Sequence, residues 1–366
     1  MHNNIASSFG EVQPWFMMDK FLASAPARVF LSGEAAFEFG AKTLALPVEV
    51  AGKRNSVAFT FQESPGKFIA YSGQQFATIV PNGRVRGDDG LRPYLEAAKA
   101  ALVAAKIQLE STDTSFSISL ESNSLQSMGL STSLCSAVFS GMFSYYGEQD
   151  DAKPAFSKAF STAGADSVTD ADVALMVSDS GLIVERSFLL DGTVKLTSKS
   201  ANLGLPEGTL LLYAEPADAK SRQAEISQAL SSFCGVTRAS GKPKATSQMT
   251  ADERAKAGSA FGSLSLKLSK ELASESPSPE KTAIYLECEH EMLSSAGAVP
   301  KPCQDAVTAA KKAGALAAKA SGFYGGALAL CHEDAVDAVA DAFGALSFVV
   351  CGPLTVSKKG MTCARV

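Results

Sequence analysis

Short strand-like runs dominate the first third of the chain, and in some of them, such as residues 116–120, apolar and polar residues alternate. A period of two is typical of strands that bury one face. The strand-like runs predict strands at residues 28–32, 43–50, 57–62, 68–71 and 116–120. Three segments have the apolar spacing of helices instead, namely residues 91–105, 133–146 and 154–163. Two more strands are predicted at residues 171–178 and 182–188.

The second half of the chain shows the same mixture of elements. Residues 192–208 are rich in turn formers and polar residues, so we expect a lobe boundary there. Beyond it the pattern predicts strands at 209–214, within 321–331 and at 346–351, and helices at 219–233, 260–274, 279–295, 302–318 and 333–343. Residues 235–258 contain few large apolar residues, and we expect a mobile loop that acts as a lid.

Length supports a division into two lobes. A chain of 366 residues exceeds the size at which one core usually stops growing. The predicted domains are an N-terminal extension (residues 1–20), a first lobe (21–200) and a second lobe (201–366). The extension lacks the long apolar stretch of a signal peptide.

Composition narrows the classes of partner. Hydrophobic residues make up 46% of the chain and charged residues 19%, as in a soluble globular protein. The formal net charge of −5 gives no reason to expect nucleic acid or a membrane as a partner. The seven cysteines are scattered and form no C-x-x-C pair, which predicts reduced thiols and a cytoplasmic location.

Candidate chemistry begins at a turn of small residues between a predicted strand and a predicted helix. The turn consists of Ser127, Met128, Gly129, Leu130, Ser131, Thr132 and Ser133. Such a turn presents backbone N–H groups at a helix N-terminus, where the helix dipole also attracts anions, above all phosphate. Its hydroxyl groups are candidate magnesium ligands. The alternative is a plain helix cap made by a serine hydroxyl.

Three segments, in this order along the chain, resemble the motifs of the GHMP kinases. The first is APARVFLSGEAAFEFG at residues 25–40, which resembles A-P-G-K-V-x-L-x-G-E-H/Y-A-V-x-x-G. The second is the turn itself, SMGLSTSL at 127–134, which resembles G-x-G-L-G-S-S-A. The third, KASGFYGGA at 319–327, resembles K-x-T/S-G-x-G-G-G. The resemblance covers about residues 22–352.

Further segments are similar to those of mevalonate kinases, with phosphomevalonate kinases second. They are GADSVTDADVA at 164–174, AEPADAKSR at 214–222 and EHEMLSSAGAV at 289–299. In the first of them the family has an aspartate that faces the substrate hydroxyl, and the alignment gives this place to Asp170. Spacing alone does not choose between Asp170 and Asp172, because in an extended segment both would point to the same face.

The resemblance implies a fold, a reaction and a set of site residues. The fold is α+β with two lobes, a ribosomal-protein-S5-like N-terminal lobe and a ferredoxin-like C-terminal lobe, and an active site in the cleft between them. The reaction is ATP-dependent phosphorylation of an alcohol, most similar to that of mevalonate kinase, with Mg²⁺ as a cofactor. Asp170 and Arg28 are the implied catalytic residues, and the turn at 127–133 binds ATP. Glu34, Ser221, Gly322, Gly325 and Gly326 are the implied substrate-binding residues, and Ser133 the metal ligand. Expected partners are ATP and a small-molecule alcohol, with a homodimer as an open alternative.

Several residues depart from the family pattern. Arg28 stands where the family usually has a lysine, and Ala35 replaces its histidine or tyrosine. Ser127, Ser131 and Tyr324 replace glycines. A glutamate that binds magnesium in the family has no acidic counterpart here, because Lys158 lies near its place. Three alternatives therefore stay open: a phosphomevalonate kinase, another alcohol or sugar kinase of the superfamily, and a GHMP-fold protein that binds a ligand without catalysis.

Overall fold

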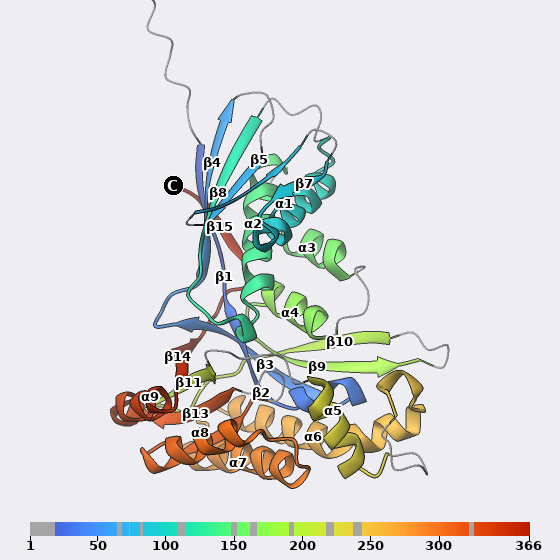
Figure 1. Ribbon diagram of the computed structural model, residues 1–366, viewed down its shortest axis with the longest axis vertical. Helices are drawn as coiled ribbons and strands as arrows, with labels where there is room; N and C mark the ends of the chain where they lie inside the picture. Colours follow the sequence, from blue (N-terminus) through green and yellow to red (C-terminus); the bar gives the residue numbers. More distant parts are fainter. Residues whose placement is uncertain are drawn as a thin grey trace, which may run out of the picture.

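The fold consists of two stacked units, each built on one sheet. The computed structural model describes residues 19–63, 68–72, 74–80, 83–108, 114–147, 152–161, 167–189, 194–216, 223–236, 244–321 and 326–366. Figure 1 shows the first sheet and its helices at one end of the long axis and the second sheet with its helices at the other. The predicted two-lobed α+β architecture is confirmed.

The first sheet has seven strands in the order β15-β1-β4-β8-β5-β6-β7. Their bounds are β1 Asp19–Ala25, β4 Asn55–Glu63, β5 Phe68–Ser72, β6 Gln75–Ile79, β7 Val85–Gly87, β8 Thr114–Glu121 and β15 Thr362–Arg365. Among the described strands of this sheet only the β5–β8 pairing is parallel, so the sheet is mainly antiparallel.

Three helices cover one face of this sheet (Figure 1). They are α1 Arg92–Ala104, α2 Leu130–Tyr146 and α3 Ala152–Ser161. Their buried residues, among them Leu95, Phe139 and Phe156, form one core with Phe59 and Phe116 of the sheet. A sheet with one face against helices explains the alternating pattern that predicted its strands.

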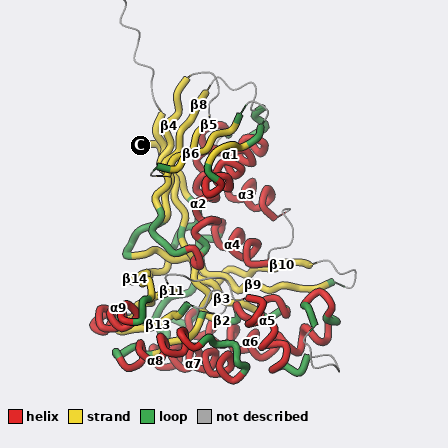
Figure 2. Tube along the Cα trace, in the orientation of Figure 1, coloured by secondary structure: helices red, strands yellow, loops and turns green. Residues whose placement is uncertain are grey.

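The second sheet follows the order β10-β9-β3-β14-β11-β13-β12, and β2 also pairs with β3. Its strands are β2 Ala27–Ser32, β3 Lys42–Val50, β9 Gly181–Phe188, β10 Val194–Ala201, β11 Thr209–Pro216, β12 Ala317–Ala320, β13 Ala327–His332 and β14 Phe348–Val356. The helices packed on it are α6 Ala251–Leu272, α7 Pro279–Ser295, α8 Lys301–Lys312 and α9 Val336–Ala345, and α5 Gln223–Phe233 packs on the 3-10 helix at Glu34–Phe39. Figure 2 shows these helices gathered at the outer end of the molecule.

One helix, α4 Ser167–Val177, lies between the two units (Figure 1). We predicted a strand at 171–178, and this prediction is wrong. The segment from Ala171 to Val177 is a short and almost wholly apolar run, and such a run does not by itself distinguish a buried strand from a buried helix. The correction matters because a helix places positions two apart on different faces.

Three other boundaries differ from the sequence predictions. Strand β10 lies inside the segment expected to be a linker, and its residues are mostly exposed, so no buried alternation marked it. Helix α8 ends at Lys312, and the alanine-rich end of the predicted helix forms β12 instead. Helix α6 begins at Ala251, inside the predicted lid, with a capping box between Thr250 and Glu253. The rest of the predicted lid at 237–243 lies outside the described residues.

The two sheets do not separate at residue 200. Strands β2, β3, β9 and β10 join the sheet of the second half of the chain, and β15 returns to the first sheet. The predicted boundary at residue 200 stays a prediction. All seven cysteines are free thiols, as predicted. Within the described residues, the helices fall short of the length and apolar content that crossing a bilayer requires.

Candidate active site

Arg28 lies at the centre of the candidate site. It is in β2, whose six residues are all buried, and only 3% of Arg28 is exposed. Its Nε donates to Oδ1 of Asp172, and its Nη2 lies 3.5 Å from Oδ2 of the same carboxylate. Its Nη1 donates to the backbone oxygen of Ser127 at 2.8 Å, and the guanidinium lies 4.2 Å above the Phe30 ring. Arg28 thus joins the first sequence motif to the second.

Asp172, in helix α4, is the carboxylate that faces Arg28 in the structure. It is 5% exposed and lies one helical turn before Met176 in α4. The backbone of Asp170 is part of the same helix, but its side chain lies outside the described residues. Because the segment is helical, the expectation that both aspartates would share one face does not apply. The catalytic role of Asp170 stays a prediction, and the observed ion pair points to Asp172.

Gly129 lies directly against this ion pair and begins helix α2. Its φ of 71° is left-handed, which glycine adopts without strain. A Cβ atom here would lie 3.1 Å from Cγ of Arg28 and 3.5 Å from Oδ2 of Asp172. Among the described residues no side chain caps the helix, which leaves the amides of its first turn suited to an anion. The side chains of Leu130, Ser131 and Thr132 are partly exposed. The first turn of α2, at residues 130–132, is therefore the accessible part of the predicted ATP-binding turn, and it lies beside a fixed guanidinium charge. Its binding of ATP stays a prediction.

Two residues of β11 connect the turn to the second half of the chain. The Ser127 hydroxyl donates to the half-buried carboxylate of Glu215, whose pKa is raised by burial. Burial also raises the pKa of the Tyr213 hydroxyl to about 12, so this group stays protonated. The Tyr213 hydroxyl contacts the Ser321 hydroxyl at 3.3 Å and also Ser127. All three sequence motifs therefore meet here, as expected of a site in the cleft.

A second buried charge cluster, which we call the lysine cluster, consists of Lys319, Glu34 and Glu289. All three side chains are 0% exposed. Nζ of Lys319 donates to Oε1 and Oε2 of Glu34 at 2.9 and 3.1 Å, and lies 3.3 Å from Oε1 of Glu289. Oε1 of Glu289 also accepts the N–H of Gly33 at 2.9 Å. The cluster joins the start of the 3-10 helix at Glu34–Phe39 to α7 and β12.

The lysine cluster contains two carboxyl groups and one ammonium group. Burial raises the pKa of Glu289 to about 7, although Lys319 acts in the opposite direction. Burial lowers the pKa of Lys319, but the two glutamates outweigh it and hold that pKa above its usual value. Oε2 of Glu289 has no hydrogen-bond partner among the described residues. A proton on Glu289 would leave the buried cluster neutral, which a site without solvent favours.

Other predicted site residues have structural contacts. Glu34 is enclosed in the lysine cluster, and its burial there does not fit the predicted contact between Glu34 and a substrate. Met128 is fully buried in the core of the second sheet. Gly326 packs against β11, where a Cβ atom would lie 2.7 Å from the carbonyl oxygen of Ala214. Ser221, Gly322 and Gly325 lie outside the described residues.

Ser133 does not fit its predicted role as a magnesium ligand. It is 0% exposed, and its hydroxyl donates to the Ala25 carbonyl at 3.1 Å and accepts from Nδ2 of Asn55 at 3.0 Å. It is not a helix cap either, because α2 begins at Gly129 without a side-chain cap. A group of three or more His, Cys, Asp or Glu side chains suited to a metal does not occur in the described part of the chain.

Sequence reasoning missed Glu215, Tyr213 and Glu289 as members of these clusters. Glu215 lies near the end of a strand and Glu289 within a helix, both positions where an acidic residue is commonly exposed. The only signal was the place of Glu215 and Glu289 in segments that resemble mevalonate kinases. Their contacts arise from the folded arrangement of β2, β11, α7 and the turn before α2.

The structure is similar to several solved kinases, each of low sequence identity. Mevalonate kinase from Methanococcus jannaschii has a TM-score of 0.62 at 13% identity, over 94% of this chain and 99% of that one. Galactokinase from Lactococcus lactis, complexed with galactose, has a TM-score of 0.59 at 15% identity, over 97% and 96%. Phosphomevalonate kinase from Streptococcus pneumoniae, in complex with phosphomevalonate and AMPPNP, has a TM-score of 0.59 at 12% identity, over 96% and 100%. No protein-family model and no curated protein matches the sequence. The chain has the fold of the GHMP kinases, as its three motifs predicted.

Proposed function

We propose that this protein is an ATP-dependent kinase that transfers the γ-phosphoryl group to the hydroxyl group of a small alcohol, and that this alcohol is mevalonate. One observation carries the proposal. The Arg28–Asp172 ion pair lies against Gly129, at the uncapped N-terminus of α2. A carboxylate, a fixed positive charge and an anion site are thereby adjacent, and phosphoryl transfer needs this combination.

Each group has a defined task in this reaction. The first-turn amides of α2 bind phosphate oxygens of ATP. Arg28 stabilises the negative charge that develops on the transferred phosphoryl group, and it keeps the Asp172 carboxylate ionised. Asp172 orients the acceptor hydroxyl and accepts its proton. Arginine can serve here in place of a lysine because the step requires a positive charge and not the loss of a proton. Mg²⁺ would be supplied as the complex with ATP, and it would neutralise part of the phosphate charge.

The choice of acceptor rests on the second lobe. Residues 214–222 and 289–299 resemble the corresponding segments of mevalonate kinases, and the fold is similar to that of the archaeal mevalonate kinase. The similarity to a phosphomevalonate kinase makes phosphomevalonate the second acceptor to test. Galactose and homoserine test the wider superfamily.

A coupled assay of ADP release tests the proposal. The purified protein is incubated with MgATP and, separately, with mevalonate, phosphomevalonate, galactose or homoserine, and phosphorylated product is identified by mass spectrometry. We expect turnover with mevalonate, and turnover lower by about two to three orders of magnitude in Arg28→Met. Turnover with a different alcohol would show that the proposed acceptor is wrong and would support the proposed kinase activity.

A protein that binds nucleotide without catalysis is the second candidate. The enclosed carboxylate of Glu34 and the buried hydroxyl of Ser133 favour it, because both were expected to contact ligands. Calorimetry with MgATP separates the two functions. Binding of MgATP without ADP release on any of the four alcohols would establish this second function and reject the first.

A further inference from the structure

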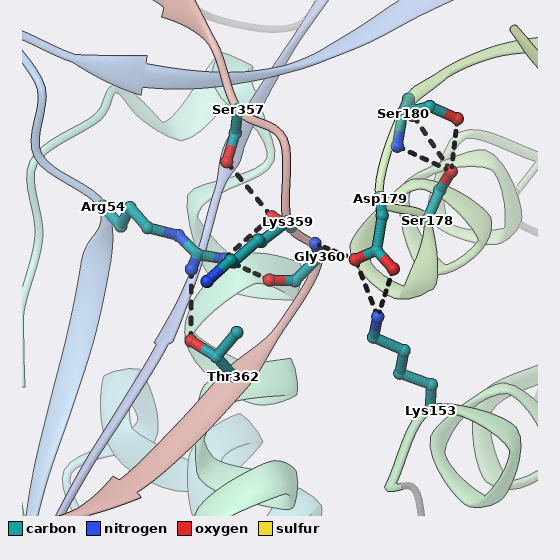
Figure 3. Close-up of polar contacts among 9 residues, drawn as sticks. All are labelled: Arg54, Lys153, Ser178, Asp179, Ser180, Ser357, Lys359, Gly360 and Thr362. Atoms are coloured by element: carbon teal, nitrogen blue, oxygen red, sulfur yellow. Dashed lines mark hydrogen bonds and ion pairs between the residues drawn. The ribbon is translucent and has the colours of Figure 1, made fainter. Parts of the chain in front are cut away.

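The last residues of the chain cross from the second sheet to the first. Strand β14 ends at Val356, and β15 begins at Thr362 and pairs with β1. We call residues 357–361 the crossover. Figure 3 shows the crossover between Arg54 on one side and Asp179, just after α4, on the other. It therefore lies beside the helix that carries Asp172.

The crossover supplies hydrogen-bond donors to the C-terminal end of α4. The N–H of Met361 donates to the Met176 carbonyl at 2.7 Å, and the N–H of Gly360 donates to Oδ1 of Asp179 at 2.8 Å. Met176 is in the last turn of the helix, where backbone carbonyl groups find no N–H donor within the helix. The crossover thus takes the place that a C-cap motif would otherwise fill.

Gly360 approaches α4 more closely than any other residue type could. A Cβ atom at this position would lie 2.6 Å from the Met176 carbonyl oxygen and 2.8 Å from that of Ser178. Both are backbone atoms, so added volume has to displace the helix or the crossover. The φ of Gly360 lies outside the left-handed region, so an alanine here would act through volume alone.

The opposite side of the crossover is fastened to the sheets. Nη2 of Arg54 donates to the carbonyls of Lys359, at 3.1 Å, and Gly360, while its Nη1 donates to Oγ1 of Thr362 at 3.1 Å (Figure 3). The N–H of Ser357 donates to the Pro47 carbonyl of β3 at 2.8 Å. The crossover is therefore a fixed support and not a loose tail.

Asp179 is also held on its far side. Nζ of Lys153, from α3, lies 2.7 and 2.8 Å from its two oxygens. The Lys153 hydrogen bond, and then the Gly360 N–H, lower the pKa of Asp179, so the carboxylate stays ionised near neutral pH. The bond from Gly360 to Asp179 is thus charge-assisted, which makes it stronger than a neutral one.

We propose that the crossover is a positioning element for the candidate site: by fixing the C-terminal end of α4, it sets the place of Asp172 against Arg28. Asp172 lies one helical turn before Met176, and a packed helix moves as a rigid body. A displacement at Met176 is therefore transmitted to the carboxylate. The effect on turnover rests on the proposed kinase function, whereas the effect on the helix does not.

Gly360→Ala tests this proposal in the full-length protein. We expect kcat to fall about 10- to 100-fold, because a misplacement of up to about 1 Å has effects of this size, while KM for MgATP changes less than about twofold. Gly344→Ala is the matched control. It is in α9, has no atom within 4 Å of the added Cβ, and should leave kcat unchanged.

Hydrogen–deuterium exchange of the backbone amides supplies a measurement independent of catalysis. In Gly360→Ala we expect faster exchange in a peptide that covers residues 171–177, with the exchange of α8 unchanged. Asp179→Ala should show the same pattern more weakly, and it serves if Gly360→Ala does not fold. A wild type without kinase activity would reject the proposed function, and the exchange experiment would still decide the role of the crossover.

Two results would overturn the proposal. One is a folded Gly360→Ala, or Asp179→Ala in its place, in which kcat and the exchange of 171–177 equal those of the wild type. The other is a uniform rise in exchange over α4 and α8 with unchanged kcat, because that pattern describes a general loss of stability. A fall in kcat with faster exchange confined to α4 would support the positioning role.

Discussion

The two buried ion clusters of this molecule differ in charge balance and in access. The Arg28–Asp172 pair has one cation and one anion. The Arg28 side chain is 4% exposed and the Asp172 side chain 6%. The lysine cluster has one cation for two carboxyl groups and is 0% exposed. The pair lies beside an uncapped helix N-terminus, whereas the lysine cluster is enclosed between elements.

This difference separates two kinds of motif residue. Arg28 and Glu34 belong to the same 16-residue motif, and the sequence suggested ligand contacts for both. The structure places Arg28 beside the N-terminus of α2, where we propose that phosphate binds, and Glu34 holds a turn against β12. A charged residue in a motif thus contributes either to chemistry or to architecture, and its counter-ions and exposure decide which.

The largest expected effect comes from breaking the matched pair. Arg28→Met leaves the Asp172 carboxylate buried without a cation, which should lower the free energy of unfolding by about 3–5 kcal/mol. Turnover should fall by about two to three orders of magnitude, as when a charge-stabilising donor is removed. Urea unfolding and the coupled assay measure the two effects. Arg28→Lys is the control, and it should retain substantial activity because it keeps the charge. Equal loss in both variants would show that the forked geometry, not the charge, is required.

Removal of the cation from the lysine cluster should destabilise the fold with a smaller effect on chemistry. Lys319→Met leaves two carboxyl groups buried together, and the free energy of unfolding should fall by about 3–5 kcal/mol at neutral pH. Glu289→Gln is the matched variant, because it removes the second carboxyl group of the cluster and keeps an oxygen that accepts the Gly33 N–H. At neutral pH it should change the free energy of unfolding by less than about 1 kcal/mol. A larger loss in Glu289→Gln than in Lys319→Met would contradict the charge balance that we assign.

The second carboxyl group of the lysine cluster, that of Glu289, also predicts that the free energy of unfolding depends on pH. The pKa of Glu289 is raised from 4.5 to about 7 in the folded protein, so between these values the folded state binds a proton that the unfolded state has lost. The contribution of Glu289 to stability is therefore complete below about pH 4.5 and is lost as the pH rises to about 7, by at most about 1.4 kcal/mol per pH unit.

Urea unfolding of the wild type and Glu289→Gln at a series of pH values measures this term. The free energy of unfolding of the wild type minus that of the variant should fall between about pH 5 and 7 and stay constant above. A difference that rises over this interval would mean that burial does not govern the ionisation of Glu289.

The smallest effect is expected at an ion pair on the surface. Lys301 and Asp305 form an i,i+4 pair in α8, with side chains that are 82% and 48% exposed. Solvent screens such a pair, so Asp305→Ala should change the free energy of unfolding by less than about 0.5 kcal/mol. A loss comparable to that of Lys319→Met would show that burial does not explain the contrast between clusters.

Much of the fold was predictable because burial leaves a periodic signal. Strand β4 alternates buried Val57, Phe59 and Phe61 with more exposed neighbours, and it was predicted nearly to its ends. Strand β10 is exposed almost throughout and left no such signal. Helix α4 is apolar over most of its length, so its period could not be recognised.

The candidate site was predictable in its motifs but not in its pairings. The motif resemblance located Arg28 and the turn before α2, and the structure brings these two together in the candidate site. The choice between Asp170 and Asp172 depended on whether the segment was extended or helical, which the sequence alone did not settle. The roles of Glu289 and Gly360 depend on contacts between residues far apart in the chain, and no local pattern encodes them.

Turnover of Asp172→Asn, with Asp170→Asn as its control, tests the central claim most directly. Both substitutions keep the shape of the side chain and remove its charge. We predict that Asp172→Asn lowers kcat by about two to four orders of magnitude with a smaller change in KM, as expected for a carboxylate that orients the acceptor hydroxyl and accepts its proton. Asp170→Asn should retain most of the activity. Loss of turnover in Asp170→Asn with full activity in Asp172→Asn would contradict the account and return the catalytic role to Asp170.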